Sequence, residues 1–253
     1  MDSNPLKAKL YAGEPAFGVS LMFPSPQIVE MLGRLGFDWV LIDCEHGAIS
    51  LESIELMALA AERVGITAIA RPVSNDKQAI MQLMDRGVSG VQIPHVNTSD
   101  DARLAVEAVK FYPQGDRGLA AGTRAAEYGF GISQHEHTEW ANRETLVCVQ
   151  IEERQAIDNL DEILEVQGVD VFFVGPSDLS QSLGYPGLTD SPIVREMIET
   201  AFRKIAARGK ISGSAGNAEA VQDYLHQGVR YVYTHVPTLL SNASTEFFQK
   251  VRV

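Results

Sequence analysis

The chain has 253 residues, of which 45% are hydrophobic and 21% charged, and its formal net charge at pH 7 is −12. This is the composition of a globular protein, and strong acidity without a basic stretch argues against a nucleic-acid partner. The two cysteines stand alone in apolar runs, which favours reduced thiols over a disulfide framework. No apolar run reaches the roughly 18 residues of a membrane helix, and the N-terminus lacks a signal-like apolar core, so we expect a cytoplasmic protein.

Eight short apolar segments recur along the chain and have the character of strands. Nearly continuous apolar runs of this length are typical of parallel strands that are buried on both faces. The eight segments span residues 17–23, 39–45, 67–73, 90–96, 146–152, 171–177, 211–216 and 230–236.

An amphipathic segment follows each strand, with one long insertion between the fourth helix and the fifth strand. Ser50 is a typical N-cap and Gly65 a typical C-terminal stop for the second of these helices. Eight strand–helix units predict one (β/α)₈ barrel over residues 1–253. An open doubly wound sheet is the alternative, but neither GxGxxG nor GxxxxGK[ST] occurs. The insertion, at about residues 112–144, is long enough to indicate a lid or binding loop. The helical segments are 24–37, 50–65, 76–87, 99–111, 154–168, 191–209, 217–228 and 237–251.

Polar residues gather where several of the predicted strands end. Chemistry in such barrels sits at the carboxyl ends of the strands, so these residues should face one another. Each has a structural alternative, such as a capping acid or a hydrogen-bonded histidine, but their convergence favours a functional site. They are Asp43, Glu45 and His46 after strand two, Arg71 after strand three, His95 after strand four, Gln150 and Glu152 after strand five, Gly175, Pro176, Ser177 and Asp178 after strand six, and His235 at the end of strand eight.

Glu152 and Asp178 are hard oxygen ligands that come from neighbouring strands. Two carboxylates, together with water and a bidentate substrate, make an octahedral site for Mg²⁺ or Mn²⁺, whereas zinc prefers His or Cys ligands. A 2-oxo acid would chelate such a metal, which then stabilises the enolate formed by carbon–carbon cleavage or proton removal. Arg71 could add positive charge at the enolate oxygen, and His46, oriented by Asp43, could act as general base.

The lysines sharpen this prediction. A Schiff-base aldolase needs a lysine inside a strand or at its carboxyl end. The seven lysines lie outside the predicted strands and away from their carboxyl ends, which disfavours that mechanism: Lys7, Lys9, Lys77, Lys110, Lys204, Lys210 and Lys250.

With these residues in view, the chain resembles the HpcH/HpaI aldolase family. These are class II, metal-dependent pyruvate aldolases on a (β/α)₈ barrel, such as 4-hydroxy-2-oxoheptanedioate aldolase. The resemblance covers nearly the whole chain and is carried by GFDWVLIDCEHG, ARPV, LMDRGVSGVQIPHV, YPQGDRG, VQIE and GVDVFFVGPSDLSQSLG.

The resemblance implies a role for each site residue. Glu152 and Asp178 look like the metal ligands, His46 like the base with Asp43 as its partner, and Arg71 like the residue at the pyruvyl or enolate oxygen. The remaining assignments are Gln150 near that oxygen, the groups of Gly175, Pro176, Ser177 and Asp178 at the substrate carboxylate, and Asp85 at the entrance, contributed by a neighbouring subunit. Members of the family are hexamers, trimers of dimers, that exchange C-terminal helices.

Other polar residues are less tied to a role. Glu45 is interpreted as a supporting residue near the site. Arg124 and Tyr128, in the insertion, are candidates for gripping the distal part of the substrate, with surface polarity or a subunit contact as the equal alternative. The histidines of the HEH segment, His135 and His137, are expected to face solvent.

The sequence therefore predicts an enzyme that reversibly cleaves 4-hydroxy-2-oxo acids to pyruvate and an aldehyde through a metal-bound pyruvate enolate. It would use Mg²⁺ or Mn²⁺, or Co²⁺, and no organic cofactor. A decarboxylase or other lyase of oxaloacetate-like acids would use the same residues and is the alternative. A binding or structural barrel is a third hypothesis, against which the intact acid pair with Arg71 and His46 argues.

Overall fold

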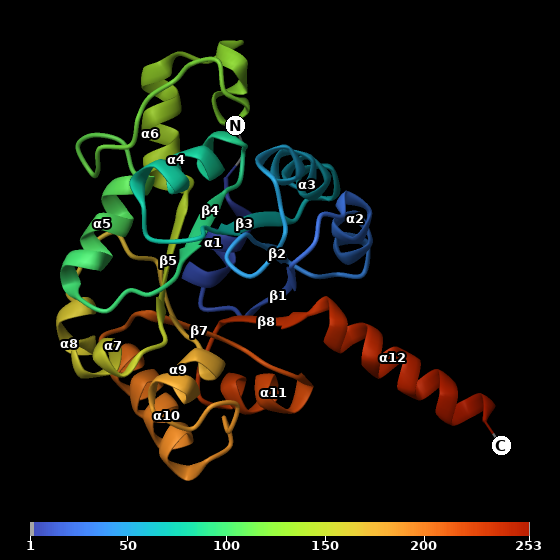
Figure 1. Cartoon of the computed structure of the whole chain (residues 1–253). Helices are drawn as coiled ribbons and strands as arrows, with labels where there is room; N and C mark the ends of the chain where they lie inside the picture. Colours follow the sequence, from blue (N-terminus) through green and yellow to red (C-terminus); the bar gives the residue numbers. More distant parts are fainter. Residues whose placement is uncertain (1–2, 253) are drawn as a thin grey trace.

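The predicted strands form a closed barrel in which each strand pairs in parallel with the next and β8 pairs with β1. The computed structural model describes residues 3–252 (Figure 1). This confirms the (β/α)₈ prediction, and the strands end one to three residues before the predicted ends. The strands are β1 (Ala16–Leu21), β2 (Trp39–Asp43), β3 (Thr67–Arg71), β4 (Gly90–Ile93), β5 (Leu146–Ile151), β6 (Val171–Val174), β7 (Ile211–Ala215) and β8 (Tyr231–His235).

The alternation of side chains within each strand decides which residues point into the barrel. Trp39 and Leu41 of β2 belong to the inner hydrophobic cluster, and the intervening residues pack outward against the helices. Side chains two residues apart share a face, so the next inward position of β2 is Asp43. The same step in β5 leads from Cys148 to Gln150. The carboxyl ends of the strands thus carry polar side chains inward above an apolar interior.

An aromatic layer closes the barrel below these polar residues. The rings of Trp39 and Tyr231 stack with centroids 4.0 Å apart, and Tyr233 meets Trp39 edge-on at 5.6 Å. Gly18 makes room for this layer, because a Cβ atom at that position would lie 2.3 Å from the Trp39 ring. The polar residues at the carboxyl ends of the strands therefore lie above a packed interior rather than above an open pore.

Most helices coincide with the predicted segments. These are α2 (Pro26–Arg34), α3 (Leu51–Val64), α4 (Lys77–Asp85), α5 (Ser99–Val109), α10 (Pro192–Ala207), α11 (Ala218–His226) and α12 (Val236–Val251). The segment predicted as one helix over 154–168 is divided into α7 (Arg154–Asp158) and α8 (Leu160–Ile163). Asn159 interrupts it with φ −95° and ψ 7°, and its side-chain amide donates to the Asn97 carbonyl over 2.9 Å. Two short helices were not predicted, α1 (Pro5–Tyr11) and α9 (Pro176–Ser182).

The insertion has secondary structure of its own. It contains a 3₁₀ segment, η1 (Arg124–Gly129), and an α-helix, α6 (Gln134–Glu144). The helix begins with a reciprocal cap, in which Ser133 accepts from the Glu136 amide and the Glu136 carboxylate accepts from the Ser133 amide. The insertion is thus an ordered addition to the barrel, not an unstructured loop.

The HEH segment lies in the first turn of α6 and its two histidines have different surroundings. His135 is exposed, as predicted, but His137 is only 3% exposed, so the prediction was wrong for His137. Its ring lies 5.6 Å from that of Phe111 and 6.3 Å from that of Trp140. Helical spacing separates the two side chains onto different faces, and α6 buries only the face that carries His137.

Helix α12 extends away from the barrel instead of packing beside β8 (Figure 1). Val236 is its buried residue, while Leu240, Phe247, Phe248 and Val251 are all exposed. These side chains form an exposed apolar face on the projecting helix. No helix within residues 3–252, α12 included, is long and apolar enough to cross a membrane.

Candidate active site

A cavity of about 680 Å³ opens at the carboxyl ends of the strands. Most of the site residues that the sequence predicts meet there, although they come from four different strand ends. The predicted residues that line it are His46, Arg71, Gln150, Glu152, Gly175, Pro176, Ser177 and Asp178.

Arg71 and Asp43 form a buried ion pair at the base of this cavity. The guanidinium donates two hydrogen bonds to the carboxylate, from Nε over 2.9 Å and from Nη2 over 2.6 Å. Asp43 is fully buried and Arg71 is 6% exposed. Burial alone would lower the pKa of Arg71, but the hydrogen bond to Asp43 and nearby negative charges outweigh it and raise that pKa. The guanidinium therefore stays charged and is held in one orientation.

Asp43 does not orient the imidazole of His46 as the sequence predicted. Both carboxylate oxygens bond to Arg71, and Asp43 reaches His46 only through the backbone amide, over 3.3 Å. The His46 side chain is 55% exposed, and its Nε2 lies 3.9 Å from a Glu45 oxygen. Because β2 ends at Asp43, the following turn directs the ring of His46 away from the buried pair. The acid nearest the histidine is thus Glu45.

A chain of side-chain amides connects Arg71 to Glu152. Arg71 Nη1 donates to Gln150 Oε1 over 3.4 Å, and Gln92 Nε2 donates to the same oxygen over 2.5 Å. The Gln150 amide nitrogen in turn donates to Glu152 Oε2. Gln92 was missed in the sequence, although its inward position in β4 could have been found from the period of two.

Glu152 is a buried carboxylate with few charged partners. It is 1% exposed, and its Oε1 accepts from the His95 backbone amide over 2.8 Å. Burial, with the charge of Asp178 adding to it, raises the pKa of Glu152 to about 7, although the His95 amide opposes the shift. Such a carboxylate is primed to accept a proton or a cation.

The surroundings of Glu152 and Asp178 fit a divalent cation. Gly175 lies against Glu152, and a Cβ atom at Gly175 would lie 3.0 Å from both Cβ and Oε2 of Glu152. The absence of a side chain thus keeps space beside the carboxylate. No cluster of three or more His, Cys, Asp or Glu that could hold a metal occurs within residues 3–252. Mg²⁺ is commonly bound through one or two carboxylates, with water and substrate completing its shell.

The loop after β6 brings the start of α9 to the cavity wall. Gly175 is the N-cap, Pro176 occupies the first turn, and no side chain caps this end of the helix. The backbone N–H groups of Ser177 and Asp178 belong to the first turn, where intrahelical partners are lacking. A carboxylate is a suitable acceptor for such groups.

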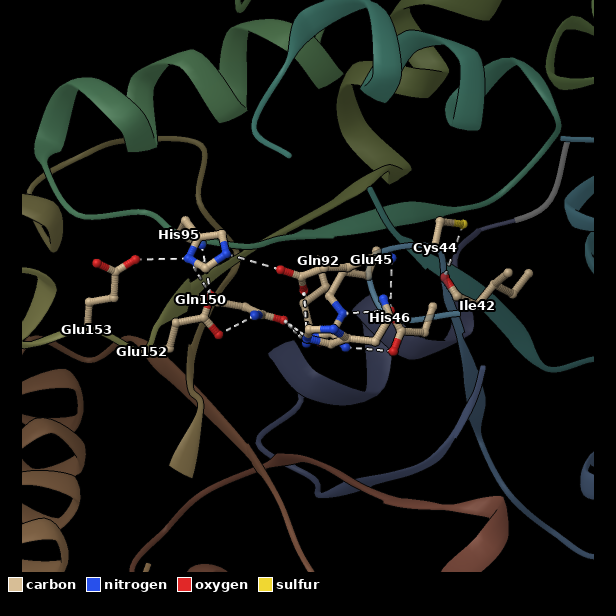
Figure 2. A network of polar contacts seen from close by, with 11 residues as sticks. Ile42, Cys44, Glu45, His46, Gln92, His95, Gln150, Glu152 and Glu153 are labelled. Atoms are coloured by element: carbon tan, nitrogen blue, oxygen red, sulfur yellow. Dashed lines mark hydrogen bonds and ion pairs between the residues drawn. The ribbon is translucent and has the colours of Figure 1, made fainter. Parts of the chain in front are cut away.

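Glu45 and His95 form a second polar cluster beside Glu152 (Figure 2). Glu45 lies 3.0 Å from Arg71 Nη1 and 3.1 Å from His95 Nε2. The other ring nitrogen of His95, Nδ1, lies 2.8 Å from a Glu153 oxygen. Burial opposes protonation, but the hydrogen bond to Glu153 and the charges of Glu152 and Glu45 raise the pKa of His95.

His235 is a further imidazole at this cavity, and the sequence noted it only as a strand end. Its Nδ1 is buried without a hydrogen-bond partner. Burial and the positive charge of Arg71 lower the pKa of His235, so the ring is neutral near pH 7.

Two predicted residues lie away from this chain's own cavity. Asp85 ends α4, shortly before β4 begins, and accepts from Arg117 Nη2 over 2.7 Å. Arg124 pairs with Glu62 near the end of α3. Both therefore lie toward the amino ends of the strands, where Arg124 lines a separate cavity of about 600 Å³. Neither can touch a substrate bound at the carboxyl ends within the same chain.

Lys110 shares one property with Schiff-base lysines but not their position. Burial, with the charge of Lys7 adding to it, lowers the pKa of Lys110 to about 7. Its Nζ donates to the Thr145 carbonyl over 2.7 Å, just before β5 begins. It is thus at the opposite end of the barrel from the cavity, in agreement with the exclusion drawn from the sequence.

Both cysteines are free thiols. Cys44 lies between Asp43 and Glu45, and burial together with the charge of Asp43 raises the pKa of its thiol to about 12. Cys148 is fully buried, and burial raises its pKa as well.

Fold and site together define a class of protein, a (β/α)₈-barrel enzyme with paired carboxylates at the ends of β5 and β6. The chain belongs to the HpcH/HpaI aldolase/citrate lyase family, a model of which matches residues 18–239. It is 37% identical over 240 residues to a 2-keto-3-deoxy-L-rhamnonate aldolase of Escherichia coli, and the aligned residues cover 94% of this chain and 89% of that protein. The chain is accordingly an aldolase, a lyase of this family.

Solved structures of the family agree in architecture. The HpcH/HpaI aldolase from Desulfitobacterium hafniense DCB-2 superposes with a TM-score of 0.90 at 28% identity, over 98% of this chain and 96% of that one. An HpcH/HpaI aldolase/citrate lyase family protein from Burkholderia cenocepacia J2315 superposes with a TM-score of 0.93 at 28% identity, over 99% of this chain and 100% of that one.

Proposed function

We propose that this protein is a divalent-metal-dependent aldolase that cleaves 4-hydroxy-2-oxo acids to pyruvate and an aldehyde, and catalyses the reverse addition. The observation that carries the proposal is the meeting of Glu152 and Asp178 with the fixed guanidinium of Arg71 in one cavity. Two hard oxygen donors suit a divalent cation, and a buried positive charge suits the oxygen of an enolate.

Glu152 and Asp178 would hold the cation, for which we expect Mg²⁺, Mn²⁺ or Co²⁺. When bound, it supplies Lewis-acid polarisation of the substrate's 2-oxo group. The uncapped amides of Ser177 and Asp178 are suited to bind the substrate carboxylate, because helix N-termini favour anions. These contacts would fix the pyruvyl half of the substrate.

Arg71 stabilises the charge that develops during cleavage. Its bidentate contact with Asp43 fixes the guanidinium, and the contact of Nη1 with Gln150 aligns the remaining donor toward the cavity. A donor that is already oriented need not reorganise as negative charge accumulates on the enolate oxygen. Asp43 thus acts through Arg71.

His46 is the base of the proposed reaction. Its half-exposed ring lines the cavity, where it can take the proton of the C4 hydroxyl directly or through one water. The oxygen electrons then form the aldehyde carbonyl as the C3–C4 bond breaks, and the electron pair of that bond becomes the enolate of pyruvate. Protonation at C3 completes pyruvate.

The substrate class that we propose is based on the substrate for which a relative is named. The Escherichia coli protein is named for a 2-keto-3-deoxy sugar acid, which is a 4-hydroxy-2-oxo acid. We infer that this chain also accepts sugar-derived acids, with an uncharged hydroxylated aldehyde as the second product.

Exchange of the pyruvate methyl protons tests the enolate directly. We expect wild-type protein with Mn²⁺ to exchange the C3 protons of pyruvate with deuterium, and chelation by EDTA to stop the exchange. NMR loss of the methyl signal measures the rate. Glu152→Gln should lower it at least about a hundredfold, because a metal ligand is lost. Glu165→Gln, on an exposed carboxylate paired with Arg208, is the matched control.

Two outcomes would change the proposal. If wild-type protein exchanges no protons with any of the three metals, the enolate mechanism is wrong. If it exchanges protons but releases CO₂ from oxaloacetate and no aldehyde from 4-hydroxy-2-oxo acids, the decarboxylase alternative replaces the aldolase.

We also propose that the protein assembles as a hexamer, a trimer of dimers, in which α12 packs on a neighbouring subunit. Support comes from the apolar residues exposed on this projecting helix, among them Leu240 and Phe247. Sedimentation analysis should find a hexamer for the wild type and smaller species for Phe247→Glu. A wild-type monomer at micromolar concentration would contradict the proposal.

A further inference from the structure

His95 has an unusual backbone for a residue with a side chain. Its φ is +55°, which places it in the left-handed region that favours glycine. Histidine tolerates this region better than most residues, but the conformation is still unfavourable for a residue with a side chain. Strained residues persist where the surroundings fix them, and they concentrate at functional sites.

The strained turn has a specific result at the metal pair. It follows β4 and aims the His95 backbone N–H at Oε1 of Glu152, over 2.8 Å. The other oxygen of Glu152 accepts from Gln150. With one donor on each oxygen, the carboxylate of Glu152 is fixed in rotation as well as in place.

The ring of His95 joins two loops of the carboxyl-end face. Its Nε2 lies 3.1 Å from Glu45 in the loop after β2, and its Nδ1 lies 2.8 Å from Glu153 in the loop after β5. Figure 2 shows the ring between these two glutamates, with Glu152 beside it. Although the side chain is 55% exposed, both nitrogens are engaged.

We propose that His95 is a positioning residue, whose left-handed backbone and bridging ring together hold Glu152 in the orientation in which it binds the cation. The inference rests on the proposed function, since it concerns the same carboxylate. His95 contacts no reacting atom in this assignment; it acts through Glu152, and its ring holds the turn in place by binding Glu45 and Glu153.

Three substitutions separate the backbone from the ring. His95→Gly keeps the N–H and adopts the left-handed turn without strain, but it removes the bridge. His95→Ala removes the bridge and disfavours the turn, so it should weaken binding most. His95→Asn tolerates the turn and keeps a short polar group. His135→Ala is the control, because His135 is an exposed histidine of α6 paired with Glu139.

Mn²⁺ affinity, measured by EPR of the free ion in the absence of substrate, is the readout. We expect His95→Ala to bind Mn²⁺ about 10- to 100-fold more weakly, as is typical when a partner of a metal ligand is lost. His95→Gly and His95→Asn should lose less than His95→Ala, and His135→Ala should bind like the wild type. At saturating Mn²⁺ the kcat of all three His95 variants should return to near the wild-type value, which a catalytic role would not permit.

The outcomes distinguish this inference from the proposed function. If Glu152→Ala weakens Mn²⁺ binding but all three His95 variants bind like the wild type, the positioning role is wrong and the metal site stands. If wild-type protein binds no Mn²⁺, or Glu152→Ala binds it equally well, the proposed metal site is wrong and the inference with it. His95→Gly keeps the test decisive if His95→Ala does not fold.

Discussion

At the amino end of the barrel, Lys110 and Asn4 donate to main-chain carbonyl groups, whereas at the carboxyl end Arg71 and Gln150 bond to other side chains. Lys110 donates to the carbonyls of Thr145 and Asn142 over 2.7 and 2.9 Å, and Asn4 donates to that of Ser89 over 3.2 Å. At the carboxyl end the partners of Arg71 and Gln150 are themselves side chains.

We interpret the polar contacts at the amino end as stabilising the fold and those at the carboxyl end as serving the chemistry. A side chain that is bonded to main-chain carbonyls holds the ends of secondary structure in place and so contributes to stability. At the carboxyl end carboxylates outnumber cations, and burial, with the charge of Asp178 adding to it, raises the pKa of Glu152 to about 7. Such an excess of negative charge is unfavourable in the folded chain alone and becomes useful when a cation binds.

The largest effect is expected from breaking the buried pair at the carboxyl end. Arg71→Met should lower the free energy of unfolding by about 3 to 5 kcal/mol, because it leaves the fully buried Asp43 without a counter-charge. It should also abolish measurable aldol cleavage. Urea unfolding and a pyruvate-release assay check both. Asp43→Asn combined with Arg71→Met should restore part of the stability and none of the activity; a double variant as unstable as the single one would contradict this explanation.

At the amino end, Lys110→Met should reduce stability alone. Loss of hydrogen bonds to the buried Thr145 and Asn142 carbonyls should cost about 2 to 3 kcal/mol. We expect kcat/KM to be unchanged at a temperature where the variant is folded. A lower kcat for Lys110→Met with normal thermal stability would contradict the assignment of the amino end to stability alone.

A smaller, pH-dependent effect is expected for Glu152→Gln in EDTA. The raised pKa means that Glu152 binds its proton more tightly folded than unfolded, so its favourable contribution is present below about pH 4.5 and is lost as pH rises through about 7. The glutamine variant avoids that loss and should be about 1 to 2 kcal/mol more stable than the wild type at pH 8, with little difference at pH 4.5. Thermal melts at both pH values measure it; saturating Mn²⁺ should reverse the order at pH 8.

The smallest effect is expected for Arg124→Ala. Its partner Glu62 is largely exposed, so the pair should contribute less than about 1 kcal/mol. Steady-state kinetics across aldehydes of different length then decide its second role. A raised KM for the aldehyde with unchanged pyruvate exchange would mean that Arg124 reaches the cavity of a neighbouring subunit.

The barrel could be predicted because its repeated strand–helix pattern is local. Apolar runs, Ser and Gly at helix ends, and polar residues at strand ends each require only neighbouring residues to be interpreted. The meeting of Glu152 and Asp178 at one cavity could also be predicted, because the carboxyl ends of parallel strands lie on one face of the barrel.

Side-chain partners were harder to predict because they depend on distances between strands. The sequence favoured His46 as the partner of Asp43, three positions away, yet Arg71 lies directly opposite Asp43 in the β2–β3 register. The left-handed backbone of His95 could not be predicted either, because no residue type near it requires such a turn. Its two contacts come from loops after β2 and β5, far apart in the chain.

The Cys44 thiol has a consequence for handling and for oxidative stress. Because its pKa is raised to about 12, the Cys44 thiol stays protonated at pH 7, and the thiolate is the form that peroxides and alkylating reagents attack. Cys44 is therefore unreactive, because its burial, with the charge of Asp43 adding to it, suppresses its ionisation. The protein should keep its activity without reducing agents, which leaves metal titrations free of thiols that would chelate the ion.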